Sequence, residues 1–346
     1  MISRKSFRSS SYFSWKKVRI SIGCFLMRWI HFCSLLFLIF YSSSWGKSNV
    51  FSWSTTAGKY TDLFIGKKKI ARYVHERMVP SDRERTYKPF HHVYDEKGED
   101  FLTKGPGGKY SHHRGIYFGF SKCSVIDGAG KKVSVDTWHC KRGYQTHEKF
   151  ISQVADDQHA SHTVEIAWKV DDGTIFATET RTLVFCFDPK QRLQIDFQSI
   201  LTSEQGEIML DGDPQHAGFQ FRASNEVYEK SADQTFYVRP REGKDKKGAT
   251  KNWPKDQTMT NLLWKGQGIV AGGKKYFTLY LDHPSNPKPS YYSERDYGRF
   301  GSYFKTKIKP NSPLRVQYRL DIGAGELLAE ECEKRSQIFL GSKDWK

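Results

Sequence analysis

Apolar and polar residues alternate with a period of two over much of the chain after residue 110. In Val164–Val170 and Leu193–Phe197 the apolar side chains fall on every second position, which is typical of half-buried strands. Turn residues bound further apolar segments, which predict strands at 115–120 and 314–320, a long strand pair or one bent strand at 174–187, and a hairpin at 269–281. Helical spacing is convincing only at Gly323–Gly341. The pattern predicts an all-β fold, a large single-domain β-sandwich with a C-terminal helix.

The first 46 residues differ from the rest and predict a signal peptide or an uncleaved N-terminal anchor. A basic lead without acidic residues precedes the short apolar run Phe32–Tyr41, and small residues follow it. The run is shorter than the roughly 20 residues that a membrane-spanning helix needs. Under either interpretation we expect residues 47–346 to form one exported domain, secreted or periplasmic.

Charge and cysteine content narrow the classes of partner. The first 50 residues carry eight lysines and arginines and no acid, so the net charge of the remainder is +9 instead of +17. The remaining charges are interspersed, which favours solvated charge over a nucleic-acid groove, so no nucleic-acid partner is expected. Cys123, Cys140, Cys186 and Cys332 would be compatible with disulfides in an oxidising compartment, but their spacing fixes no pairing.

The densest group of chemically active side chains is Asp211–Arg222, which contains two carboxylates, an amide, an imidazole and a guanidinium. Such residues beside a buried strand usually pair with one another or contact a ligand. The alternative is a polar turn leading into a strand. In the functional interpretation His216 is an acid/base, and Asp211 or Asp213 orients an imidazole or binds a metal ion.

Three further segments are candidates. Tyr110–Gly115 contains His112 and His113, which could act as acid/base or metal ligand or could be structural histidines. In Val135–Cys140, Trp138 beside His139 is a combination that sugar sites often show, although Trp138 could equally belong to the core. Asp282–Pro284 and the tyrosine-rich Tyr291–Phe304, interpreted as a glycine-containing loop, favour a binding surface.

Diagnostic motifs are absent from the sequence. It has no Cys-x-x-Cys, no His-Glu-x-x-His, no Gly-x-Ser-x-Gly and no dinucleotide-binding fingerprint. The histidines and aspartates would suffice for a divalent metal ion, but no spacing indicates one. No metal ligand is therefore assigned and the cofactor stays unknown.

Several blocks together resemble a family of exported bacterial proteins labelled methane oxygenase PmoA. They are Lys88–Tyr94, His112–Gly119, Asp136–Cys140, Leu210–Arg222, Asp282–Pro284 and Ser293–Phe304. Lys109, Tyr110 and Ser111 stand where many members carry Asp-His-Pro. The resemblance implies a galactose mutarotase-like β-sandwich (supersandwich), in which a histidine pair and a carboxylate act on a sugar ring. Residues 51–346 lack an apolar run of about 20 residues, so the chain is not the helical membrane subunit of the same name.

These observations lead to the hypothesis of an exported carbohydrate-active protein that acts on or binds a glycan or polysaccharide. The alternatives are a non-catalytic glycan-binding module and a metal oxidoreductase with histidine ligands, as the family label suggests, so enzymatic activity is left open. Arg114, Arg222 or Arg295 would hold an acidic group. The candidate catalytic residues are His112, His113, His216 and Asp213. The candidate substrate-binding residues are Arg114, Trp138, His139, Gln215, Arg222, His283, Glu294, Arg295, Tyr297 and Arg299.

Overall fold

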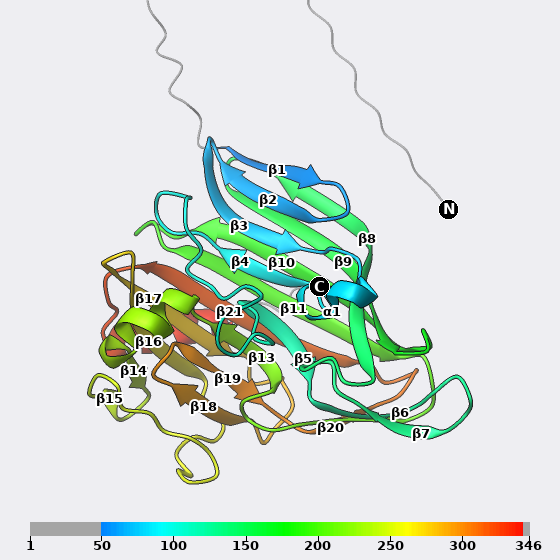
Figure 1. The fold of residues 1–346 in the computed structure, drawn as a ribbon. Helices are drawn as coiled ribbons and strands as arrows, with labels where there is room; N and C mark the ends of the chain where they lie inside the picture. The colour runs from blue at the N-terminus through cyan, green and yellow to red at the C-terminus, as the bar shows by residue number, and fades with distance from the viewer. Residues whose placement is uncertain (1–49, 342–346) are drawn as a thin grey trace, which may run out of the picture. The chain divides into compact units, whose positions relative to one another are not determined.

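The computed structural model describes residues 50–341, which form two large antiparallel sheets packed face to face and a smaller third sheet (Figure 1). The eight-stranded sheet has the order β1 (Phe51–Thr56), β2 (Tyr60–Ile65), β3 (Lys68–Val74), β4 (Phe90–Val93), β5 (Ile116–Phe120), β13 (Ala217–Arg222), β19 (Arg299–Tyr303) and β18 (Tyr291–Arg295). Its neighbours are all antiparallel.

The nine-stranded sheet contains most of the long strands. Its order is β15 (Gly243–Lys244), β14 (Phe236–Arg239), β16 (Trp264–Ala271), β17 (Lys274–Asp282), β21 (Leu314–Ala324), β11 (Leu193–Ser203), β10 (Ile175–Phe187), β9 (His159–Val170) and β8 (Gly143–Ala155). The β10–β11 register runs unbroken from Ala177↔Ser203 to Phe187↔Leu193. The predicted hairpin at 269–281 is β16 and β17. Of the two interpretations of 174–187, a strand pair or one strand, the structure has one strand, β10.

A four-stranded sheet and short helices complete the described part of the chain. The sheet has the order β20 (Thr306–Ile308), β12 (Ile208–Asp211), β6 (Lys122–Ile126) and β7 (Lys132–Val135). The helical elements are η1 (Pro80–Asp82), α1 (Arg83–Thr86), η2 (Val227–Ser231), η3 (Ala232–Gln234) and α2 (Ala329–Gly341). Among residues 50–341, no helix is long and apolar enough to cross a membrane.

The core lies between the two large sheets, where alternate side chains of each strand meet. In β9 and β11 buried positions alternate with partly exposed ones, as the sequence pattern predicts. Phe197 of β11 contacts Phe219 of β13, with ring centroids 4.3 Å apart, and Phe118 of β5 packs against both Trp168 and Phe197. Such aromatic pairs add about 1 kcal/mol each to the burial of apolar area. The predicted all-β sandwich with a C-terminal helix is confirmed.

The other face of the eight-stranded sheet is also covered, which explains why β4, β5, β13 and β19 are buried along their whole length. Along β13, Phe219 and Phe221 belong to the apolar core. Arg222, on the opposite face, lies over the Trp138 ring in the turn after β7. Loops that join the strands cover this second face, and they carry the candidate site.

Two predicted elements differ from the structure. The helix predicted from Gly323 begins at Ala329, because β21 continues to Ala324 and pairs there with Tyr276 of β17. Tyr291–Phe304, predicted as a loop, contains a tight hairpin of β18 and β19 whose residues are mostly buried. The signal-peptide prediction lies outside the described residues. The four cysteines within residues 50–341 are free.

Candidate metal centre

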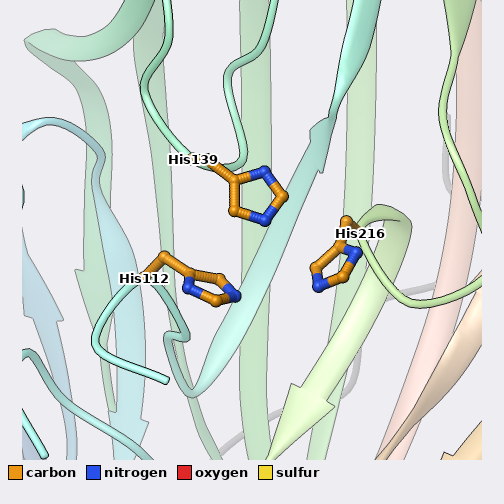
Figure 2. Close-up of side chains that lie close together, drawn as sticks. All are labelled: His112, His139 and His216. Carbon is orange, nitrogen blue, oxygen red and sulfur yellow. The ribbon is translucent and has the colours of Figure 1, made fainter. Parts of the chain in front are cut away.

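Three histidines from three separate loops converge beside the second face of the eight-stranded sheet (Figure 2). His112 follows β4, His139 lies in the turn after β7, and His216 directly precedes β13. One nitrogen from each ring lies within 4.8 Å of the other two. The ring centroids are 4.5 Å apart for His112–His139, 4.6 Å for His139–His216 and 5.5 Å for His112–His216. Sequence spacing gave no indication of this grouping.

His139 is oriented by a carboxylate three residues earlier in the chain. Asp136 accepts hydrogen bonds from the backbone N–H groups of Trp138 and His139, both at 2.8 Å, which closes a tight turn. Its second oxygen lies 2.8 Å from Nδ1 of His139. Because Nδ1 is engaged by the carboxylate, Nε2 is the nitrogen left for a ligand.

His216 is held in the same way by Asp213. The carboxylate of Asp213 accepts the backbone N–H of Gln215 at 2.7 Å and lies 3.1 Å from Nδ1 of His216. Asp211, the other carboxylate of the segment, accepts from the hydroxyl of Tyr303 and pairs with Lys305 at 3.0 Å. Of the two aspartates considered from the sequence, Asp213 is therefore the one that orients an imidazole.

His112 contributes a buried nitrogen without a partner. Its Nε2 is inaccessible to solvent and makes no hydrogen bond. Burial is the main reason that the pKa of His112 falls to about 3, and the neighbouring His139 imidazole lowers it further. His112 is consequently neutral at physiological pH, which is the form of imidazole that binds a metal ion.

Lys88 and Tyr87, which lie just before β4, form hydrogen bonds with two of these loops. The ammonium group of Lys88 donates to the backbone carbonyls of His112 at 2.9 Å and of Trp138 at 2.6 Å. The hydroxyl of Tyr87 donates to the same two carbonyls, each at 3.1 Å. Burial holds the pKa of Lys88 well below its ordinary value. The two side chains fix the distance between the loops that carry His112 and His139.

Trp138 and His113 support the cluster from inside. Trp138 is fully buried, packs against Phe90 and Tyr117, and lies edge-on to His216 at 6.2 Å. Its indole therefore packs beneath the histidine cluster and has no exposed face that could stack on a sugar. His113 is also buried; its ring contacts His112 at 4.4 Å, and burial followed by the Arg222 charge moves its pKa far below the usual range. It does not belong to the group of three histidines whose nitrogens could bind a metal ion.

Two tyrosines form an aromatic surface next to His113. The rings of Tyr110 and Tyr297 stack at 4.9 Å with an interplanar angle of 28°, and Tyr110 also stacks on His113 at 5.2 Å. Tyr110 is 37% exposed. Tyr110, which the sequence analysis did not assign, is thus better placed than Trp138 to contact a ligand.

The predicted arginines have different surroundings. Arg114 donates to the carbonyls of Ser111, His113 and Glu84, so it shapes the loop that carries His112. Arg295 donates to Asn252 at 2.6 Å and to the carbonyl of Glu294. Arg222 and Arg299 both reach the loop that carries His216, where they donate to the carbonyls of Gln215 and Pro214, respectively.

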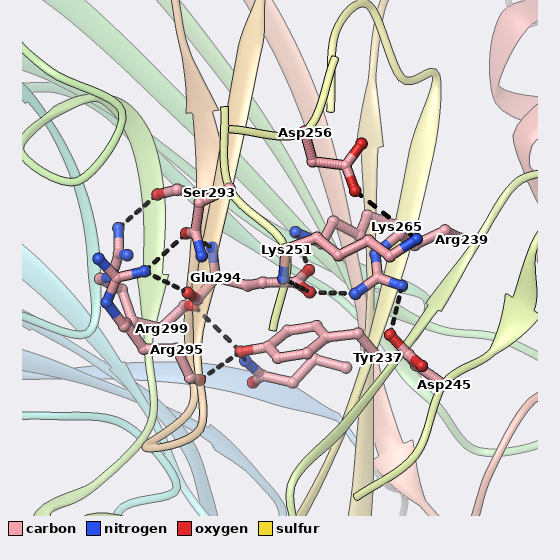
Figure 3. A network of polar contacts seen from close by, with 12 residues as sticks. Tyr237, Arg239, Asp245, Lys251, Asp256, Lys265, Ser293, Glu294, Arg295 and Arg299 are labelled. Carbon is pink, nitrogen blue, oxygen red and sulfur yellow. Dashed lines mark hydrogen bonds and ion pairs between the residues drawn. The ribbon is translucent and has the colours of Figure 1, made fainter. Parts of the chain in front are cut away.

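Two predicted site residues belong to other regions. Glu294 is buried in an ion-pair network, where its carboxylate contacts Arg239 and Lys265 of the nine-stranded sheet (Figure 3). His283 packs edge-on against Phe339 of α2 at 5.6 Å and lies 2.6 Å from the hydroxyl of Ser285. The structure brings neither residue to the three histidines.

The three imidazoles fit a divalent transition-metal ion. Two nitrogens bound about 2.0 Å from a tetrahedral ion would lie roughly 3.3 Å apart, so small rotations of the rings would close the group. The carboxylates behind His139 and His216 are the partners that metal-bound histidines usually have, since they fix the ring and raise its basicity. They also offset the positive charge of Lys88 and Arg222 nearby. Three protein ligands leave a coordination position for a further group.

The sequence contains part of the signal for this site. Asp136–His139 and Asp213–His216 share the spacing Asp-x-x-His, and each forms the same carboxylate–imidazole turn. Asp156–His159 has this spacing and this turn too, but it forms the surface turn between β8 and β9, away from the cluster. The motif thus predicts an oriented imidazole and leaves its location open. Lys88 begins one of the blocks that carry the family resemblance, but no sequence pattern indicates its role, and none marks Tyr87.

Comparison with known protein families gives one match that covers most of the chain. The profile of a family of unknown function, DUF6807, matches residues 60–337. The chain belongs to this family. All the residues of the candidate metal centre lie within the matched range. No curated protein matches the chain.

Two solved structures show a distant likeness to this DUF6807 chain. The GalM/aldose epimerase homologue from C. elegans has 7% identity and a TM-score of 0.38, covering 80% of this chain and 99% of that one. A candidate kojibiose phosphorylase from the human microbiome has 9% identity and a TM-score of 0.32, covering 82% of this chain and 32% of that one. Both are distant likenesses in fold.

Proposed function

We propose that the protein is an exported, carbohydrate-active enzyme that uses a divalent transition-metal ion held by His112, His139 and His216. The observation that carries the proposal is the convergence of these three imidazoles within 4.8 Å. The described residues contain no hydrogen bond between the three rings, and Nε2 of His112 is buried without a partner. An unsatisfied buried polar atom costs about 1–3 kcal/mol, and a bound metal ion would remove that cost.

The chemistry follows from the open coordination position. A metal ion there would polarise a hydroxyl or carbonyl oxygen of the substrate, or it would lower the pKa of a bound water. Hydrolysis of a sugar can begin with attack by such an activated water. Epimerisation and elimination can begin with removal of a proton from the carbon next to an activated carbonyl oxygen. The exposed ring of Tyr110, stacked on Tyr297, supports a sugar as substrate, because aromatic faces pack on the C–H face of a pyranose.

Metal binding is the first test. The purified full-length protein is incubated separately with Zn²⁺, Ni²⁺, Cu²⁺, Mn²⁺ and Fe²⁺, and bound metal is measured by elemental mass spectrometry. We expect one equivalent of bound metal per chain. Binding should also raise the melting temperature, because it stabilises the folded state by about 2.7 kcal/mol when the free metal concentration is a hundred times the Kd. His139→Ala and His216→Ala should lose the metal. His159→Ala, which removes the imidazole of the matching surface turn, is the control and should retain it.

Activity is the second test. The loaded protein is incubated with a panel of glycans, and products are analysed by chromatography and mass spectrometry, which separates hydrolysis, elimination and epimerisation. Product formation that requires metal and is lost in His216→Ala supports the proposal. Stable glycan binding without product would instead support a glycan-binding module. Wild-type protein that binds none of the five metals would exclude the metal-dependent mechanism.

A redox-active metal at the same histidines is the second candidate. The observation that favours it is the all-imidazole ligand set, which suits copper and iron as well as zinc. Oxygen consumption by copper- or iron-loaded protein in the presence of a glycan would support it. Equal product formation with zinc in the absence of oxygen would exclude it.

A further inference from the structure

Arg222 and Arg299 form a pair of buried, adjacent guanidinium groups beside the candidate metal centre. They are direct cross-strand partners in the antiparallel pairing of β13 with β19, so their side chains leave the same face of the sheet. Both are almost completely buried, at 1% and 0% exposure. Two like charges in such positions repel one another, and each loses its hydration.

Neither arginine has a carboxylate partner. Within residues 50–341, no acidic oxygen lies within 4.0 Å of either guanidinium, although other buried arginines such as Arg181 and Arg239 are ion-paired. Asp296, the nearest acid in sequence to Arg299, is exposed. The carboxylate of Glu294, five residues before Arg299, is occupied by Arg239 and Lys265 (Figure 3). No ion pair therefore compensates the two charges, and Asp213, which is engaged by His216, acts on both guanidiniums only from a longer distance.

The pair retains free N–H donors. Arg222 donates to the side chain of Gln220 and to the carbonyl of Gln215, while its Nε–H has no partner. Arg299 donates to Ser293 at 2.6 Å and to the carbonyl of Pro214. Its Nε and Nη2 make no hydrogen bond of ordinary geometry, and the phenol of Tyr297 is the polar group that interacts with this guanidinium. Guanidinium forks of this kind are suited to two-point contact with a carboxylate or sulfate.

The location of the pair links it to the three histidines. Both guanidiniums hold carbonyls of the segment Pro214–Gln215, which immediately precedes His216. Both charges act on the neighbouring His113, and the phenol of Tyr297 lies beside Arg299. The Tyr110–Tyr297 stack therefore covers the same region, and an entering ligand would displace the ring of Tyr297.

We propose that Arg222 and Arg299 bind an oxyanion of the substrate, a carboxylate or a sulfate ester on a sugar. The inference rests on the proposed function, because it places the acidic group of the substrate next to the metal-bound part. Uronic acids supply such a carboxylate in glycans, and sulfated sugars supply the sulfate ester. Neutral sugars lack it and would leave the donors unsatisfied.

The test compares three monosaccharides that differ in one group: D-glucuronate, D-glucose 6-sulfate and D-glucose. Binding to full-length protein is measured by calorimetry, with and without bound metal. We expect glucuronate or the sulfate to bind on the order of tenfold to a hundredfold more tightly than glucose, because charged hydrogen bonds are lost with the neutral sugar. Whichever acid binds identifies the source of the anion.

Variants separate this site from the rest of the protein. Arg299→Gln and Arg222→Gln should abolish the preference for the acidic sugar. The comparison is made in metal-free protein, because both arginines also hold the segment before His216. Arg299→Lys keeps the charge and loses the fork, so the preference should fall roughly tenfold even if the glutamine variants fail to fold. Arg319→Gln, at an arginine paired with Asp196 in the other sheet, is the control and should keep the preference.

The outcomes distinguish the two proposals. Equal binding of glucose and both acids by wild-type protein overturns the oxyanion site and leaves the metal centre untouched. A retained preference in folded Arg299→Gln also overturns it. Because the arginines belong to β13 and β19, the preference should persist in protein treated with a chelator. A preference without metal binding would support the oxyanion site and contradict the metal-dependent function.

Discussion

The ammonium group of Lys88 lies 2.9 Å from the backbone carbonyl oxygen of His112 and donates a hydrogen bond to it. The same ammonium group reaches the carbonyl of Trp138, next to His139 in the chain. A buried lysine without a carboxylate partner thus sets the spacing of two proposed metal ligands. It does so through the backbone, without contacting either imidazole.

We expect Lys88→Met to weaken metal binding by about tenfold or more. The substitution keeps the volume of the side chain but removes both hydrogen bonds, each worth about 1 kcal/mol, so the two loops are no longer held at one distance. A chelator competition measures the metal Kd. The control is Lys104→Met, at a buried lysine that donates to the carbonyls of Gly105 and Gly107. If Lys88→Met binds metal as wild type does, Tyr87 alone suffices to hold the loops.

Removing the negative charge behind the imidazoles should also reduce metal affinity. Asp136→Asn and Asp213→Asn are each expected to raise the metal Kd by about 10–100-fold, because the carboxylate both orients the ring and increases its basicity. Asp211→Asn is the matched control, since this carboxylate bonds Tyr303 and Lys305 and contacts no histidine. A loss of affinity in all three variants would point to a general effect of local charge.

Stability should fall as the pH drops below about 6.5, because of a second histidine cluster in the core. His162 lies 3.0 Å from His91, and burial lowers the pKa of His162 to about 3 and that of His147 to about 4. The groups facing them are Tyr73, which bonds His147, the imidazole of His75 and the Arg181–Glu179 ion pair, and Glu148 acts on His147. Near pH 5 the unfolded chain binds protons on these imidazoles and the folded chain does not. Unfolding is therefore favoured by acid.

Thermal denaturation between pH 8 and pH 4 measures this effect. The melting temperature should be nearly constant above pH 7 and should decrease below pH 6.5, with the decrease levelling off near pH 4 to 3. His147→Gln should make the decrease shallower, while His159→Gln, at the surface turn, should follow the wild-type curve. A melting temperature independent of pH between 7 and 4 would contradict the assignment.

Gly218 should be essential for the strand pair that carries Arg222 and Arg299. Its φ is +75°, and a Cβ atom there would overlap the carbonyl oxygen of Ser302 on β19. We expect Gly218→Ala to lower the free energy of unfolding by more than about 3 kcal/mol, because left-handed strain of about 1–2 kcal/mol adds to the clash.

A second variant, Gly243→Ala, separates the backbone strain from the steric clash in the loss of stability expected for Gly218→Ala. Gly243 has a φ of +70° and open space around the position of a Cβ atom. Its substitution should cost only the backbone strain, about 1–2 kcal/mol. Chemical denaturation of both variants gives the difference, which is the cost of the clash. Similar losses in the two variants would mean that β19 moves to make room.

The fold could be predicted from the sequence to a greater extent than the site. Alternation in Val164–Val170 and Leu193–Phe197 is a local property of each strand, so it identifies β9 and β11 directly. The end of β21 was not predictable, because its pairing with β17, and not local helix propensity, determines that the strand continues to Ala324. Tertiary contacts decided that boundary.

The sequence predicted which residues could take part in the site. It did not predict how these residues are arranged in space. His112, His139 and His216 were all candidates, but only the packing of three loops on one sheet brings them together. Trp138 and Glu294 were chosen for their chemistry, and burial removes both from a substrate. A sequence pattern gives the order of side chains along the chain and gives no information on which face of a loop becomes covered.

The three histidines come from loops that meet only after β5 has paired with β13, a contact between segments about a hundred residues apart. An unfolded or partly folded chain would not hold them close together, so metal affinity depends on completed long-range pairing. A metal-sensitive dye or a paramagnetic ion could therefore follow the last stage of folding in real time. The same dependence implies that damage to a distant strand would lower the metal affinity of the proposed centre.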